Sequence, residues 1–168
     1  PQDVLDELDA HRDAAEGGHE VYLIGRRGPQ HAAFTTKELR ELLELPGLQV
    51  TVSEDAFDGI DEASLDRRAR ANVEALRRAV ENSAPATVGG PTLHLLFWRR
   101  PVRMTGDGIV ESLVVERTTL RDGRLVGTGE ETALPVNLVL RAVGYRGTPI
   151  PGVPFDDARA VIPNQAGR

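Results

Sequence analysis

Several features are missing from this chain of 168 residues, and each absence excludes a class of function. There is no cysteine, which excludes disulfide bonds, thiolate metal sites and cysteine nucleophiles. No apolar run approaches the roughly 20 residues that span a bilayer, and no signal peptide opens the chain, so we expect a cytoplasmic protein without a membrane partner. The 4 histidines lack metal-ligand spacing, and we predict no metal site.

Lysine is almost absent, since Lys37 is the only one, and the positive charge comes almost wholly from arginine. With 20 basic and 26 acidic side chains the net charge is -6, so we expect no nucleic-acid partner. The length fits one domain. The chain begins at Pro1 without a methionine and stops at Arg168, and we expect it to be a piece of something longer.

Helical and strand patterns alternate in the first third of the chain. Thr35 and Glu38 have the spacing of a capping box, and they precede an apolar face of leucines. The predicted elements are a helix over 3–16, a buried strand over 19–25, a helix over 33–45 and a strand over 48–53. This order is typical of an α/β crossover with a parallel sheet.

The rest of the chain is predicted to form one long polar helix and then mostly strands. The turn Arg121-Asp122-Gly123 predicts a hairpin. The simplest explanation is that antiparallel strands are inserted into the α/β unit. The predicted elements are a helix over 61–82, strands over 92–98, 109–120 and 124–127, a buried strand over 137–144 and a small hairpin over 155–164. We interpret the arginines of the long helix as a solvated face, and Phe97 with Trp98 as core or rim packing.

Two adjacent arginines, Arg26 and Arg27, follow the predicted strand 19–25. In a dinucleotide-binding fold the corresponding strand ends in an acid that binds the ribose, whereas a basic residue there accommodates the 2′-phosphate of NADP. The pair therefore suggests NADP selectivity, although two arginines in a loop can also be simply solvated. No Gly-rich phosphate turn occurs upstream of residue 19, so either the fold differs or the chain starts after that turn.

A second candidate is Gly144, which ends the predicted strand 137–144. A glycine at the carboxyl end of a strand lets the backbone approach a ligand closely, but a plain turn glycine has the same local sequence. No residue has the context of an acid, a base or a nucleophile, so we predict binding residues and no catalytic ones.

Two long stretches carry a resemblance to a known family. VYLIGRRGPQHAAFTTKELRELLELPGLQV (21–50) and LVLRAVGYRGTPIPGVPFDDARAVIPNQAGR (138–168) resemble ferredoxin–NADP reductases of the adrenodoxin reductase type, which are flavoproteins of the glutathione reductase class. The stretch between them matches more loosely, including LLFWRRPVR (95–103).

The resemblance implies a fold and a division of the chain. The fold is α/β: a Rossmann-like NADP-binding domain with a parallel sheet and an inserted antiparallel β-meander, lacking its first βα unit. Residues 1–147 are expected to be the partial NADP-binding domain. Residues 148–168 are expected to be the crossover and the start of the return into the FAD-binding domain. A sheet without its first strand has an open edge, so we expect marginal stability or self-association.

The resemblance also implies an activity, with NADPH passing a hydride to FAD and the flavin passing electrons to a ferredoxin-type iron–sulfur protein. Arg26 and Arg27 match the pair that binds the 2′-phosphate, Glu38 matches a glutamate near the nucleotide, and Gly144 lies near the cofactors. We expect FAD to be held mostly by parts absent from this chain, which would then be inactive alone. The alternatives are an NADP-dependent flavoprotein subunit with another electron acceptor and a non-catalytic nucleotide-binding or interaction module.

Overall fold

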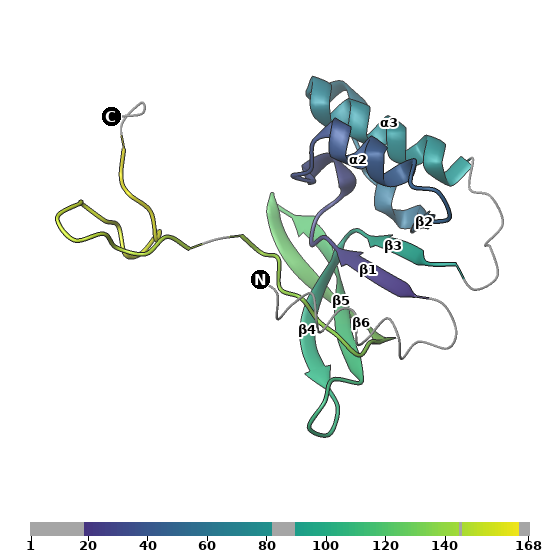
Figure 1. The fold of residues 1–168 in the computed structure, drawn as a ribbon. Coiled ribbons are helices and arrows are strands. Elements are labelled where there is room, and N and C mark those ends of the chain that lie inside the picture. The colour runs from purple at the N-terminus through teal and green to yellow at the C-terminus, as the bar shows by residue number, and fades with distance from the viewer. Residues whose placement is uncertain (1–18, 82–89, 145, 165–168) are drawn as a thin grey trace. The chain divides into compact units, whose positions relative to one another are not determined.

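The computed structural model describes residues 19–81, 90–144 and 146–164, and the predicted helix over 3–16 lies outside them. The chain divides into two compact units, 1–138 and 139–168. The described part of the first unit combines a parallel sheet, an antiparallel sheet and helices (Figure 1). This confirms the predicted α/β class with an antiparallel meander beside a parallel sheet.

The parallel sheet has the order β1-β3-β2, with β1 at Glu20–Ile24, β2 at Gln49–Val52 and β3 at Thr92–Leu96. The helices α2 (Thr36–Leu43) and α3 (Arg67–Glu81) pack together, and α3 also contacts β2 (Figure 1). The buried leucines of the two helices pack against buried side chains of β2 and β3. These contacts form the hydrophobic core that holds the sheet against the helices. The side chains concerned are Leu39, Val50, Leu76, Leu93 and Leu95.

The strand β1 forms where it was predicted, but the prediction that it is buried was wrong. Val21 is 51% exposed and Leu23 is 41% exposed. Val21 and Leu23 are paired in register with Leu93 and Leu95 of β3. The two β3 residues, by contrast, are buried in the core. Among the described residues β1 pairs only with β3, so it is an edge strand and the helices cover its neighbours better.

The helix α3 begins later than the sequence predicted. The chain first makes a 3₁₀ turn, η3 (Glu62–Ser64), in which the Asp61 side chain accepts a hydrogen bond from the Ala63 amide. Asp66 then accepts from the Ala69 amide at 2.7 Å, immediately ahead of the α-helix. Two aspartates thus bond to the local backbone in succession, which splits one predicted helix into a turn and a helix.

The antiparallel sheet has the order β4-β5-β6, with β4 at Arg99–Thr105, β5 at Ser112–Arg121 and β6 at Arg124–Pro135. Asp122 and Gly123 have φ angles of 51° and 72°, the two positive values that a type I′ hairpin turn requires. The predicted hairpin is therefore confirmed. The strand β6 is longer than predicted because it pairs along nearly all of β5.

The predicted buried strand over 137–144 does not form. The segment belongs to no strand, and Leu140 is 60% exposed and Val143 83% exposed. A strand needs a neighbouring backbone to satisfy its amides and carbonyls, and no described strand pairs with this segment. The small hairpin predicted over 155–164 is present as a bridge between Asp156 and Val161.

A partly buried ion cluster joins the 3₁₀ turn η2 (Glu54–Phe57) to the antiparallel sheet. The Asp55 carboxylate accepts from Arg99 at 3.0 Å and lies 3.4 Å from the Arg117 guanidinium. Burial opposes ionisation of Asp55, but the neighbouring Ser53 hydroxyl, Arg99 and Arg117 outweigh it, so its pKa is lowered. The carboxylate is thus more acidic in the folded chain than in the unfolded one.

We predict that Asp55→Asn lowers the free energy of unfolding by about 1.5–3 kcal/mol near neutral pH, the range for hydrogen bonds to charged groups. Because the folded pKa of Asp55 is lowered, its stabilisation is present above the unfolded pKa of about 3.9 and is lost as the pH falls through the folded pKa. Urea unfolding of both proteins at neutral and at acidic pH measures this. The control is Asp58→Asn, because Asp58 is 73% exposed and 3.9 Å from Arg117. An equal loss at both pH values would contradict the prediction.

Candidate functional site

The adjacent arginines Arg26 and Arg27 lie in the loop that leaves the carboxyl end of β1. Both side chains are exposed, and neither has an ion pair or a side-chain hydrogen bond with any described residue. Several other arginines of the described part pair with carboxylates, among them Arg78, Arg99, Arg100, Arg103 and Arg117. The loop therefore offers two unneutralised guanidinium groups at the end of a parallel strand, which is where α/β sheets bind ligands.

The backbone of this loop is held by the antiparallel sheet. The Arg26 carbonyl accepts from the Thr118 hydroxyl at 2.8 Å, and the Arg27 carbonyl accepts from the Trp98 amide at 3.3 Å. The Gly25 carbonyl accepts from the Arg99 amide at 3.1 Å. The arginine side chains are free to meet a ligand, while the backbone that carries them is fixed.

Trp98 lies directly against the loop. Its indole N–H donates to the Ala56 carbonyl at 3.3 Å, and a Cβ atom on Gly28 would come within 2.8 Å of its ring. Burial of Trp98 was predicted from the sequence and is confirmed, but its place beneath the arginine loop was not foreseen. The two segments are about 70 residues apart in the chain, and no local pattern reports a contact of that kind.

Glu38 lies in the first turn of α2 and completes the predicted capping box. Its amide donates to the Thr35 hydroxyl at 3.2 Å, and its carboxylate accepts from the Thr35 amide at 2.7 Å and from the Thr35 hydroxyl at 2.8 Å. These hydrogen bonds lower the pKa of the Glu38 carboxyl. The contacts of Glu38 are therefore those of a helix cap, and a place near the nucleotide stays a prediction.

Gly144 belongs to the second unit and is exposed, with a φ angle of 102°. That conformation favours glycine, since an L side chain is strained there. The arginine loop and the start of α2 belong to one continuous segment of the first unit, and Gly144 is not part of it. Its predicted place near the cofactors stays a prediction.

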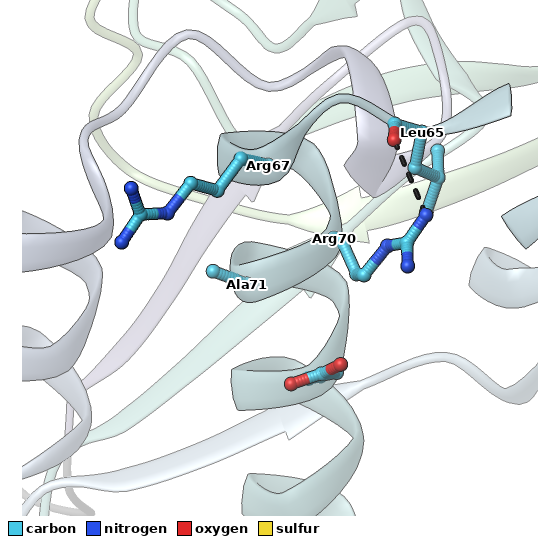
Figure 2. Close-up of a pocket in the computed structure, with 5 residues that line it drawn as sticks. Leu65, Arg67, Arg70 and Ala71 are labelled. Atoms are coloured by element: carbon cyan, nitrogen blue, oxygen red, sulfur yellow. Dashed lines mark hydrogen bonds between the residues drawn. The ribbon is translucent and has the colours of Figure 1, made fainter. Parts of the chain in front are cut away.

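A shallow depression lies on α3 and on the turn before it (Figure 2). It is lined by residues of the helix and of the turn before it: Leu65, Arg67, Arg70, Ala71 and Glu74. The Arg70 guanidinium donates to the Leu65 and Glu62 carbonyls. One of the two arginines that line the depression is therefore bonded within the chain. None of the predicted site residues lines this depression.

The arrangement around the arginine loop is suited to an anion. Guanidinium groups offer forked donors that match phosphate oxygens and stay charged at physiological pH. The loop leads through η1 (Pro29–His31) to the amino end of α2, where the helix dipole also favours negative charge. The described residues contain no cluster suited to a metal ion. They also contain no helix long and apolar enough to cross a membrane.

Comparison with known proteins bears out the resemblance seen in the sequence. The chain is similar to two NADPH-dependent reductases over most of its length. It is 41% identical over 160 residues to the NADPH-ferredoxin reductase FprA of Mycobacterium tuberculosis, which covers 90% of this chain and 35% of that protein. It is 37% identical over 164 residues to the human mitochondrial NADPH:adrenodoxin oxidoreductase, which covers 88% of this chain and 33% of that protein.

Among solved structures the fold matches Mycobacterium tuberculosis FprA in complex with NADPH, with a TM-score of 0.79 and 40% identity. The match covers 89% of this chain and 34% of that one. This chain thus spans about a third of the length of the relatives it matches. No family model matches the chain.

We predict that Thr35→Ala lowers the free energy of unfolding by about 1 kcal/mol, the usual cost of losing an N-cap side chain. The substitution removes the acceptor for the Glu38 amide and one donor to the Glu38 carboxylate. Chemical denaturation measures the loss. Thr36→Ala is the matched control, because it removes the same atoms one position later, outside the cap. Equal effects of the two substitutions would count against the capping role.

Proposed function

We propose that this chain binds the 2′-phosphate end of NADPH through Arg26 and Arg27. The observation that carries the proposal is the pair of exposed guanidinium groups, without partners in the described residues, at the carboxyl end of β1. A phosphate with about two negative charges pairs well with two such groups, and NADH lacks that phosphate. The pair would therefore set a preference for NADPH over NADH.

The fit to the nucleotide is supported by the chemistry of the loop. No carboxylate stands at the end of β1 to bind the ribose hydroxyls of NADH, because the positions after Ile24 are Gly25, Arg26, Arg27 and Gly28. The first acid after the loop, Glu38, accepts the hydrogen bonds of its own helix cap and has no ion pair with the arginines. Both features favour a ligand with an extra phosphate.

The role of the whole protein is proposed by similarity. Relatives that match this chain are named as NADPH-dependent reductases of ferredoxin and adrenodoxin. We propose that the protein passes electrons from NADPH through FAD to a ferredoxin-type iron–sulfur partner in the cytoplasm, and that this chain provides its NADPH side. The nucleotide supplies the hydride, and the residues described here bind and orient its adenosine end.

The test is the double substitution Arg26→Ala with Arg27→Ala in the 168-residue chain. We expect the dissociation constant for NADPH to rise about tenfold or more, because each charge-assisted hydrogen bond to phosphate contributes about 1.5–3 kcal/mol. The dissociation constant for NADH should change little. Fluorescence titration with each nucleotide measures both.

A second adjacent arginine pair provides the control. Arg67 and Arg68 are also exposed, and they are the first two residues of α3. Replacing both by alanine removes the same charge from the chain, so it separates a specific site from general electrostatic attraction. If this control weakens NADPH as much as the loop variant does, or if the loop variant weakens both nucleotides equally, the assignment of the 2′-phosphate site is wrong.

A further inference from the structure

The loop that carries the two arginines is held by three consecutive carbonyl groups. The carbonyls of Gly25 and Arg27 accept from the backbone amides of Arg99 and Trp98. The carbonyl between them, that of Arg26, accepts from the side chain of Thr118 at 2.8 Å. The middle contact of the three is therefore the one that depends on the identity of a side chain.

Thr118 is fixed in place by the sheet around it. It is 2% exposed, and its amide donates to the Trp98 carbonyl at 2.9 Å. The register between β5 and β6 shifts between Glu116 and Thr118, and the extra residues lie in β6, because Glu116 pairs with Glu131 and Thr118 with Gly127. From β5 the buried Thr118 hydroxyl reaches a loop 92 residues away in sequence.

The Arg26 carbonyl belongs to the peptide unit that joins the two arginines. Rotation of that unit would turn the side chains of Arg26 and Arg27 relative to each other. Two adjacent cations repel, so without a ligand their electrostatic energy falls when they move apart. A hydrogen bond to this carbonyl opposes that rotation and keeps the two groups arranged before the ligand arrives, which lowers the cost of ordering them on binding.

We propose that Thr118 is a positioning residue that determines the preference for the 2′-phosphate by holding the peptide unit between Arg26 and Arg27. The inference rests on the proposed function of the arginine pair. Thr118 acts through the backbone of the loop and touches no ligand itself.

The test compares Thr118→Val with the unaltered 168-residue chain. Valine keeps the shape and burial and removes the hydroxyl. We expect the dissociation constant for NADPH to rise about 3- to 10-fold, the range that corresponds to the loss of one hydrogen bond, with that for NADH nearly unchanged. Thr118→Ser restores the hydroxyl and should return the ratio of the two constants to within about twofold of its original value.

Thr128→Val is the matched control. The Thr128 hydroxyl donates to the Arg117 carbonyl at 3.2 Å, so this variant also loses a bond from a threonine hydroxyl to a backbone carbonyl in the same sheet. It should lower the melting temperature and leave the ratio of the NADPH and NADH constants unchanged. If Thr118→Val does not melt cooperatively, Thr118→Ala is measured in its place, because it removes the hydroxyl without adding an apolar methyl near the carbonyl.

The outcomes separate this proposal from the function on which it rests. If alanine at both arginines leaves the ratio of the two constants unchanged, the proposed 2′-phosphate site fails. Suppose instead that the arginines are required, but the folded Thr118 variant keeps the original ratio or weakens the binding of both nucleotides equally. Then the positioning role of Thr118 is wrong, while the 2′-phosphate site stands. A changed ratio that serine restores, with none in the Thr128 variant, supports it.

Discussion

The structure of the first unit depends on the burial of Trp98 at the point where the chain passes from the parallel to the antiparallel sheet. Trp98 lies between β3 and β4 and has a φ angle of 53°, a conformation that is uncommon for a bulky residue. The strain is offset by the burial of a large aromatic ring and by the indole hydrogen bond to Ala56. With the tryptophan so placed, its backbone amide meets the Arg27 carbonyl and its ring meets Gly28. One residue thus joins the two sheets and the loop after β1.

Ion pairs reinforce this junction, and none of them includes Arg26 or Arg27. Asp55 binds Arg99 and lies near Arg117, which ties the turn after β2 to the first two strands of the antiparallel sheet. Within that sheet the buried Glu116 carboxylate accepts from Arg100 at 2.7 Å and from the Gly129 amide at 2.9 Å. These carboxylates are satisfied where they stand. None of these contacts uses Arg26 or Arg27.

Features set by neighbouring residues were predictable from the sequence, and features set by distant contacts were not. The capping box of Thr35 and Glu38 and the hairpin turn at Asp122 depend on a few adjacent positions, and both form as expected. The segment 137–144 has the composition of a strand, yet composition cannot supply the neighbouring backbone that a strand requires. Similarly, Arg26 and Arg27 stand out by residue type and position, whereas no local pattern marks Thr118, whose hydroxyl contacts a carbonyl 92 residues away in sequence.

Selectivity for a phosphate requires cations that the protein has not already neutralised, and such cations are costly to hold together. Freedom of the side chains and rigidity of the backbone are therefore both needed. In this chain the first acid after the loop, Glu38, accepts from the amide and hydroxyl of Thr35, so its carboxylate is satisfied by the helix cap. The rigidity comes from the other direction, through hydrogen bonds from the antiparallel sheet to the loop carbonyls. The inserted meander is thus more than an appendage of the parallel sheet, because its first two strands hold the backbone on which the arginine pair is displayed.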